Sequence, residues 1–274
     1  MIAFSRPVSI VALRGGFGNQ LFTWAYGQEL VRDGHFVLYD RGDGLGRGFA
    51  LEGLIPKSRL IHLPTVAWRK IAGIGSTSIL RNRSFLKVED QSLPPDLENR
   101  DTRFVSLHWG YWQSMDYFSQ SKDNVFEKVV RWLAVALDGA AETCAIHVRR
   151  GDYVSDPSAA AVMGTLSLSY YKRAILLMKQ RGFADFVVYS DDRTWAIANI
   201  LPLDDAIRIA ETADDEDFNR MAGSGGLITA NSSFSWWAAF VVSMSGGQVV
   251  APRDWFADST LNSSRIVPNT WTAV

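Results

Sequence analysis

Short apolar runs alternate with longer segments of helical period along most of the chain. In the first half this pattern predicts strands at residues 8–14, 35–40 and 104–109 and helices at 19–33 and 123–137. We expect Asp123 to cap the second helix, and the glycine-rich stretch 42–56, which has little periodicity, to be a loop. Strands that alternate with helices in this way are typical of parallel sheets.

The second half shows the same alternation more regularly. It predicts strands at 143–148, 186–190, 207–210, 227–230 and 249–252 and helices at 169–181, 193–201 and 234–245. We therefore predict an α/β protein with two Rossmann-like, doubly wound domains, 1–138 and 139–274, whose last residues pack back on the first domain. Two such domains facing one another would hold a ligand in the cleft between them, at the carboxyl ends of both sheets.

Composition narrows the classes of function. A chain of 274 residues with 47% hydrophobic and 21% charged residues is an ordinary globular protein, and a net charge of -1 without a basic run argues against a nucleic-acid partner. The single cysteine, Cys144, excludes a disulfide framework and favours a reducing compartment. The apolar run at 8–13 ends at Arg14 and is too short for a signal peptide or an integral membrane segment, so we expect a cytoplasmic protein.

Two arginines follow the predicted strand 143–148, in the sequence HVRRGDY. Guanidinium groups at the end of a parallel strand suit phosphate oxygens, and Gly151 permits close approach of the backbone. Two interpretations fit Arg149 and Arg150. They bind a phosphorylated ligand, which we favour because strand ends in such sheets host ligands, or they pair with Asp152 and nearby acids in a surface loop.

The sequence GGFGN at 15–19 joins the first predicted strand to the first predicted helix. Gly16 and Gly18 permit a tight turn, and the positive N-terminus of the helix suits an anion or a polar sugar group close to Asn19. The alternative is a plain strand-to-helix turn. The spacing of the glycines is that of neither the dinucleotide fingerprint nor the P-loop.

An aspartate pair, Asp191 and Asp192, follows the predicted strand 186–190. Such a pair binds a metal ion, a ribose or a base edge, or it caps the next helix, and capping is the favoured interpretation for one of the two. Similar pairs occur elsewhere in the chain, and the four histidines and one cysteine are scattered, so we see no cluster of metal ligands and predict no metal site.

Hydroxyl and aromatic side chains follow other predicted strand ends. Ser232 and Ser233 precede the helix at 234–245, where they would cap it or bind a phosphate. Trp236 and Trp237 lie in that helix and are expected in the core, because the helix is apolar nearly all round. The aromatic residues at 109–112 either stack on a sugar or pack within their own loop.

Six segments run in order across most of the chain: GGFGNQLFTWAYG at 15–27, HWGYWQSMDYF at 108–118, HVRRGDY at 147–153, SLSYYKRAI at 167–175, YSDD at 189–192 and NSSFSWWAAF at 231–240. Together they resemble the α-1,2-fucosyltransferases, in particular the compact bacterial members of glycosyltransferase family 11 that are related to the vertebrate H-antigen enzymes. The first, third and last segments are the most specific, and residues 41–103 match nothing in this family.

The resemblance implies a GT-B fold, a GDP-fucose donor bound mainly by the second domain, and an inverting reaction that needs neither a divalent ion nor another cofactor. It implies that Arg149 binds the donor diphosphate and that His147 lines the nucleotide pocket. Asp217 occupies, by spacing, the position of an aspartate that reads guanine, although the glycines within 221–228 are expected to shorten its helix.

The same resemblance implies roles for the other candidates. Ser232 and Ser233 would donate to the phosphates, Asp191 or Asp192 would face the nucleoside, and Asn19 would lie near the reacting centre. The acceptor would be a galactose-containing glycan or surface polysaccharide precursor, contacted by loops of the first half. The vertebrate relatives carry a membrane anchor, whereas this chain looks like the bacterial cytoplasmic form, with peripheral membrane association left open.

The chemistry of sugar transfer agrees with this resemblance. Cleavage of the fucose–phosphate bond builds negative charge on GDP, which fixed arginines and a helix N-terminus stabilise without a cation. Asp152 is the one acid that the sequence places near that centre, so we take it as the candidate base. The alternatives are a fucosyltransferase of another linkage or acceptor and an inactive nucleotide-sugar-binding protein of the same fold. An NAD-dependent enzyme lacks the required fingerprint.

Overall fold

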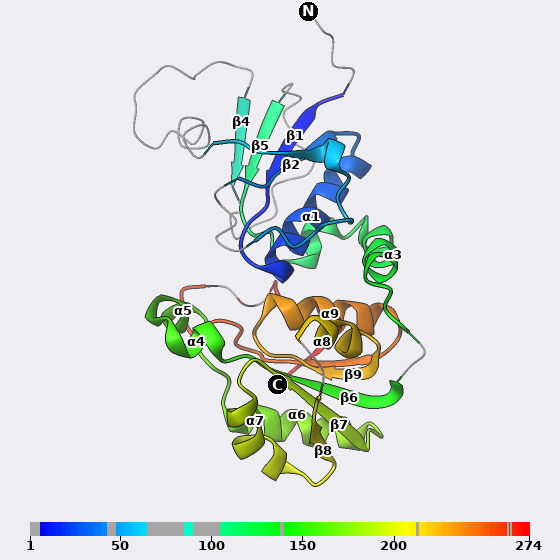
Figure 1. The fold of residues 1–274 in the computed structure, drawn as a ribbon, viewed down its shortest axis with the longest axis vertical. Helices are drawn as coiled ribbons and strands as arrows, with labels where there is room; N and C mark the ends of the chain where they lie inside the picture. The colour runs from blue at the N-terminus through cyan, green and yellow to red at the C-terminus, as the bar shows by residue number, and fades with distance from the viewer. Residues whose placement is uncertain are drawn as a thin grey trace, which may run out of the picture. The chain divides into compact units, whose positions relative to one another are not determined.

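The chain forms two compact units, Met1–Lys128 (unit 1) and Val129–Val274 (unit 2), each built around its own parallel sheet (Figure 1). The structure, a computed structural model, describes residues 6–42, 48–64, 85–89, 105–137, 140–211, 214–261, 263 and 265–274. The division falls inside helix α3 (Lys122–Leu133), whereas the boundary expected from the sequence, 138/139, lies in the connection after this helix.

Unit 1 contains a five-stranded sheet in the order β3-β2-β1-β5-β4. Its strands are β1 (Val8–Ala12), β2 (Phe36–Asp40), β3 (Leu60–Ile61), β4 (Phe85–Glu89) and β5 (Val105–Trp109). Its helices, besides α3, are α1 (Phe17–Arg32) and the 3-10 helices η2 (Lys57–Arg59) and η4 (Met115–Phe118). Because β1 pairs in parallel with both β2 and β5, the carboxyl ends of these three strands lie at one edge of the sheet.

Unit 2 contains a six-stranded sheet in the order β11-β10-β9-β6-β7-β8. Its strands are β6 (Ala140–Val148), β7 (Asp185–Ser190), β8 (Ile207–Ile209), β9 (Ser224–Ile228), β10 (Gln248–Ala251) and β11 (Thr272–Ala273). Its helices are α4 (Gly151–Ser155), α5 (Pro157–Val162), α6 (Leu168–Gln180), α7 (Arg193–Asn199), α8 (Asp214–Ala222), α9 (Ser233–Met244) and the 3-10 helix η5 (Leu201–Leu203). No helix in the described part of the chain combines the length and the apolar character needed to cross a membrane.

The chain end joins the second sheet. Thr272 and Ala273 pair in parallel with Val250 and Ala251, so β11 is an edge strand beside β10. From the sequence we expected the last residues to pack on the first domain. This backbone pairing makes them part of the sheet of unit 2, and their packing on the first domain stays a prediction.

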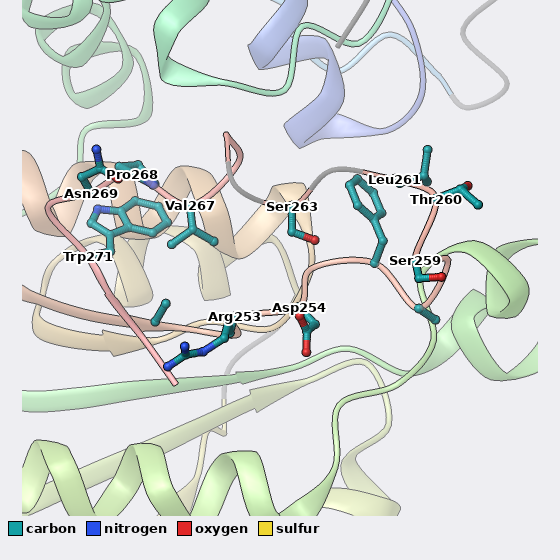
Figure 2. A pocket seen from close by; sticks show the side chains of 13 residues that line it. Arg253, Asp254, Ser259, Thr260, Leu261, Ser263, Val267, Pro268, Asn269 and Trp271 are labelled. Carbon is teal, nitrogen blue, oxygen red and sulfur yellow. The ribbon is translucent and has the colours of Figure 1, made fainter. Parts of the chain in front are cut away.

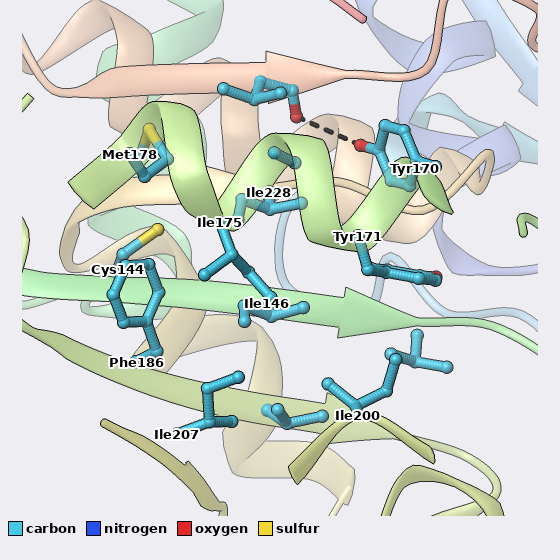
Figure 3. Close-up of a cluster of buried hydrophobic side chains, with 14 of the residues drawn as sticks. Cys144, Ile146, Tyr170, Tyr171, Ile175, Met178, Phe186, Ile200, Ile207 and Ile228 are labelled. Carbon is cyan, nitrogen blue, oxygen red and sulfur yellow. Dashed lines mark hydrogen bonds between the residues drawn. The ribbon is translucent and has the colours of Figure 1, made fainter. Parts of the chain in front are cut away.

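One buried hydrophobic cluster of unit 2 lies where α6 packs on the sheet (Figure 3). Ile146 and Val188 from neighbouring strands and Ile175 from α6 are almost fully buried in it. The Tyr170 hydroxyl, at the start of α6, donates to the Thr229 carbonyl at 2.7 Å and lies 3.4 Å from the Val250 carbonyl. Cys144 is completely buried, as the strand pattern predicted, and burial raises the pKa of its thiol, so it stays protonated.

The start of α3 differs from the prediction. This helix begins at Lys122, so Asp123 lies within its first turn and the predicted aspartate N-cap is wrong. The backbone N–H and the hydroxyl of Ser121, just before the helix, both donate to the Glu29 carboxylate of α1, at 2.9 and 2.8 Å. The helix stops at Leu133 because Ala134 has φ 51, which is incompatible with a right-handed helix.

The glycine-rich segment 221–228, which includes β9, allows close packing. A Cβ atom on Gly226 would lie 2.5 Å from the Met178 methyl carbon and 2.7 Å from the Phe183 ring, so a larger residue would have to displace both side chains. Its glycines lie around the start of β9, and α8 still extends over nine residues. Asp217 lies within this helix, which ends at Ala222, just before the first of these glycines.

Candidate functional site

Three neighbouring strands bring the main sequence candidates of unit 2 together. The sheet order places β6 between β9 and β7, all three in parallel. Val148, the last residue of β6, lies opposite Ser190, the last residue of β7. The segments that follow these strands, 149–152, 191–192 and 231–233, therefore meet at the carboxyl edge of the sheet, where α/β proteins bind their ligands.

Two carboxylates hold the Arg149 side chain at this edge. Its Nη2 lies 2.6 Å from Asp152 Oδ1 and its Nη1 lies 2.9 Å from Asp191 Oδ2. The side chain is 22% exposed, so the guanidinium is fixed but accessible. Pairing with Asp152 and a nearby acid is the alternative that the sequence left open, and the structure shows it. A guanidinium that is fixed in this way and still accessible also suits a ligand phosphate.

Arg150 has different surroundings. Its Nε donates to Asp192 Oδ2 at 3.1 Å, and its guanidinium carbon lies 4.2 Å from the centre of the Trp195 ring. Asp192 is the N-cap of α7, because its other carboxylate oxygen accepts the Trp195 backbone N–H at 3.0 Å. Helix capping, the interpretation favoured for one of the two aspartates, is therefore confirmed for Asp192.

Asp191 links the two strand ends. Besides its ion pair with Arg149, it accepts the backbone N–H of Arg150 at 2.8 Å. A Cβ atom on Gly151 would lie 2.5 Å from Asp191 Oδ2. The glycine after the two arginines thus gives the aspartate carboxylate the space to reach them.

His147 is buried at the end of β6. Burial, and then the charge of Arg149, lower the pKa of its imidazole to about 3, so the ring is neutral near pH 7. Its ring lies 5.7 Å from that of Phe234. Among the described residues, Nδ1 has no hydrogen-bond partner. A buried, neutral nitrogen without a partner is suited to hydrogen bond with a ligand.

Serine and asparagine side chains line the start of α9. Ser232 is the N-cap, and its hydroxyl accepts the Phe234 backbone N–H at 3.3 Å, which leaves its own proton to donate. Ser233 is the first residue of the helix and is half-buried. Asn231, to which we gave no role, donates to the carbonyls of Met163 at 2.7 Å and Trp255 at 3.2 Å, which fixes the loops around the helix start.

Two further expectations for this region concern α8 and α9. Asp217 is half-buried on α8. Burial raises the pKa of Tyr189, near the end of β7, and the negative charge of the Asp217 carboxylate raises it further. Its neighbour Phe218 packs edge-on against Phe234 at 5.5 Å. Trp236 and Trp237 are fully buried, which confirms that they belong to the core.

The remaining candidates lie in unit 1. Gly15 has φ +66, a conformation that favours glycine, and Gly16 is the N-cap of α1. Gly18 is buried in the first turn of the helix. The Asn19 Oδ1 atom accepts a hydrogen bond from Gln113 Nε2 at 2.7 Å. Gln113 lies in the segment 108–118 that resembles the fucosyltransferases, and its place in that segment is the signal by which it could have been found.

The aromatic residues of that segment divide between core and surface. Trp112 is fully buried and stacks on Tyr26, with ring centres 4.0 Å apart, whereas Tyr111 is 39% exposed. The guanidinium of Arg14 lies over the rings of both Trp109 and Tyr111. In the sequence, Arg14 stands out only as the end of an apolar run. The one feature that could have indicated a functional role is its position between a predicted strand and a glycine-rich turn.

A separate cavity of about 1090 Å³ lies in unit 2, along the segment that follows β10 (Figure 2). It is lined by residues between Arg253 and Ala273, and none of the predicted site residues borders it. Within the described ranges, no group of three or more histidine, cysteine, aspartate or glutamate side chains is arranged to hold a metal ion.

Comparisons with known proteins give the family. Residues 96–274 match glycosyl transferase family 11. The chain is 28% identical to an α-1,2-colitosyltransferase of Escherichia coli, over 97% of this chain and 99% of that protein. It is 33% identical to the O-antigen biosynthesis glycosyltransferase WbnK of Escherichia coli, over 48% of this chain and 44% of that protein.

Among solved structures, a mutant of Arabidopsis thaliana FUT1 in complex with GDP is similar with a TM-score of 0.53 at 14% identity, over 92% of this chain and 72% of that one. This likeness concerns the fold, which is of the Rossmann-like GT-B type that the sequence predicted. The chain thus belongs to glycosyl transferase family 11 and is a glycosyltransferase, and its similarity to an O-antigen enzyme is consistent with polysaccharide biosynthesis.

Proposed function

We propose that this protein transfers L-fucose from GDP-fucose to the 2-hydroxyl of a terminal galactose, with inversion and without a divalent metal ion. The observation that carries the proposal is the Arg149 guanidinium, held by two carboxylates at the carboxyl edge of the second sheet beside the buried His147. Similarity to an α-1,2-colitosyltransferase along nearly the whole chain supports the linkage. Similarity to an O-antigen glycosyltransferase supports a surface polysaccharide precursor as the acceptor.

In the proposed donor complex, the diphosphate replaces the carboxylates around Arg149. The guanidinium fork then binds phosphate oxygens, and the hydroxyls of Ser232 and Ser233 donate to them at the positive N-terminus of α9. Asp217 accepts hydrogen bonds from the guanine edge. The neutral His147 provides a further hydrogen bond inside the same pocket.

The proposed transfer step follows from this exchange of partners. The acceptor oxygen attacks the anomeric carbon, the bond from that carbon to the β-phosphate oxygen breaks, and GDP leaves with the electron pair. Asp152, released from Arg149 by the diphosphate, accepts the proton of the acceptor hydroxyl. Asn19, whose amide is oriented by Gln113, donates to the reacting sugar.

A second donor deserves the same test, because a colitosyltransferase is similar over nearly the whole chain. Colitose is fucose without its 3-hydroxyl. A site that hydrogen-bonds this hydroxyl discriminates strongly against the deoxy sugar, whereas an apolar site does not. The ratio of kcat/KM for the two GDP sugars therefore reports which kind of pocket the protein has.

The experiment is a donor screen with purified protein and a terminal β-galactoside as acceptor. GDP-fucose, GDP-colitose and UDP-galactose are compared, and the linkage of each product is determined by NMR. We expect an α-1,2-linked product from a GDP sugar and none from UDP-galactose. A product from UDP-galactose alone, or a linkage to another hydroxyl, would contradict the proposal.

A further inference from the structure

Arg14 lies at the carboxyl edge of the unit 1 sheet, beside two aromatic residues. It follows β1 in the connection to α1, while Trp109 ends β5 and Tyr111 comes just after it. Because β1 and β5 pair in parallel, with Val11 opposite His108, these strand ends are neighbours. The carboxyl edge of a parallel sheet is where side chains meet a ligand.

The two rings hold the Arg14 guanidinium in place. Its central carbon lies 4.3 Å from the centre of the Trp109 ring and 4.8 Å from that of Tyr111. Its Nε atom is buried, and among the described residues it has no hydrogen-bond partner. A guanidinium with its face against aromatic rings keeps the N–H groups of its edge for a ligand, and this edge matches the oxygens of a carboxylate or phosphate.

The loop after β5 has a backbone conformation that presents Tyr111. Trp112 has φ 54, in the left-handed region that bulky residues rarely adopt. This turn buries Trp112 completely against Tyr26 and leaves Tyr111 39% exposed. The next residue, Gln113, donates to Asn19 at 2.7 Å. One loop thus connects the aromatic cluster to the residue that we place near the reacting sugar.

We propose that Arg14, Trp109 and Tyr111 bind an anionic group of the acceptor, the guanidinium edge contacting its oxygens and Tyr111 packing on the adjoining sugar ring. The anion is the carboxylate of an acidic sugar or the phosphate of a glycosyl carrier, which present the same charged oxygens. This inference rests on the proposed function in so far as the ligand is the acceptor.

The test compares three acceptors that share one terminal galactose: a neutral galactoside, the same unit joined to a uronic acid, and the same unit joined to a diphosphate. Arg14→Gln removes the charge, and Arg59→Gln is the matched control. Arg59 also lies over an aromatic ring, that of Phe36 at 3.9 Å, but Phe36 starts β2 at the opposite edge of the sheet.

We expect Arg14→Gln to raise KM about tenfold or more for one or both anionic acceptors, the loss expected for a charge-assisted contact. KM for the neutral galactoside and Kd for GDP should change less than about twofold, as they should in Arg59→Gln. The acceptor whose KM rises shows whether the bound anion is the carboxylate of an acidic sugar or the phosphate of a carrier. Equal KM effects on neutral and anionic acceptors, or a loss of GDP affinity instead, would overturn the proposal.

Calorimetric titration separates this inference from the proposed function. Without any donor, the wild-type protein should bind the anionic glycans more tightly than the neutral one, and Arg14→Gln should abolish this preference. If GDP sugars give no product but the preference is present and depends on Arg14, the proposed function fails and the anion site stands. If products form but no such preference exists, the anion site fails.

Discussion

One carboxylate oxygen of Asp191 lies 2.9 Å from the Arg149 guanidinium, across the gap between the ends of β7 and β6. The other oxygen accepts the Arg150 backbone N–H at 2.8 Å, so the aspartate fixes both the side chain and the turn that carries it. The position of Arg149 is therefore set by the neighbouring strand as well as by its own. The Arg150 side chain pairs with Asp192, so the two guanidinium groups have different partners.

Replacing Arg149 with lysine should reduce kcat by about a hundredfold or more. The charge is kept, but a lysine ammonium lacks the planar fork that binds two oxygens at once. If the fork acts mainly in the transition state, kcat should fall more than the affinity for GDP, as steady-state kinetics and GDP titration would show.

Arg150→Lys is the matched control, because Arg150 pairs with Asp192 and stacks on Trp195. We expect it to lose less activity than Arg149→Lys. A folded Arg149→Lys protein with nearly full activity, beside an inactive Arg150→Lys protein, would assign the diphosphate to the second arginine.

Gly151→Ala should lower kcat about tenfold. It should change the free energy of unfolding by less than about 1 kcal/mol. The added Cβ would lie 2.5 Å from Asp191 Oδ2, so the carboxylate must move and Arg149 loses its support. Alanine favours the helix that starts here, which limits the cost to folding. Gly48→Ala, where no atom lies within 4 Å of the added carbon, is the control. Equal activity of the two variants would refute the supporting role of Asp191.

His147 should make folding stability depend on pH between about 6.5 and about 3. Its folded pKa is about 3, whereas an unfolded histidine has a pKa of about 6.5. As the pH falls below 6.5 the unfolded chain binds the proton first, so stability is lost, by about 1.4 kcal/mol per pH unit.

Urea unfolding at pH 6.5 and 5.5 measures this effect. Between these two pH values, the free energy of unfolding should fall by about 1 kcal/mol more in the wild type than in His147→Gln, whose glutamine does not titrate. A variant at the exposed His62, His62→Gln, should keep the wild-type dependence. The same pH dependence in all three proteins would show that His147 is not buried in the neutral form.

Transfer should continue in excess EDTA. In the proposed reaction the Arg149 guanidinium meets the charge of the leaving diphosphate, and both aspartates of the 191–192 pair form ion pairs with Arg149 and Arg150. Rates are compared in EDTA alone and with magnesium or manganese restored. A loss in EDTA that either metal reverses would identify Asp191 and Asp192 as metal ligands.

Most strands and helices were predictable because their apolar pattern reflects burial in parallel sheets. The run that forms β6 is buried on both faces, and α9 is apolar nearly all round, so both are evident in the sequence. The two-residue strand β11 carries no such pattern, since its pairing with β10 depends on the tertiary fold. The predicted loop at 42–56 falls partly outside the described residues, which do not include 43–47.

The candidate site was predictable as a set of strand ends but not as a set of contacts. Motif positions placed Arg149 and Asp191 after two strands, while their ion pair follows from the order of the strands in the sheet. Arg14 could not be found this way, because a single arginine after an apolar run belongs to no motif. Its role depends on Trp109 and Tyr111, which are distant in sequence and adjacent only after β1 and β5 pair.

In the proposed function, the carboxyl edge of the second sheet binds a guanosine diphosphate sugar. Thermal unfolding with GDP, UDP or ADP, each at the same concentration, shows which nucleotide the folded protein binds. At about 100 times its Kd, GDP should raise Tm by roughly 5–10 °C, and UDP and ADP should raise it far less. In the Asp217→Asn variant, most of the difference in Tm between GDP and the other two nucleotides should disappear. Equal stabilisation of the wild-type protein by UDP or ADP would contradict the assignment of GDP as the nucleotide.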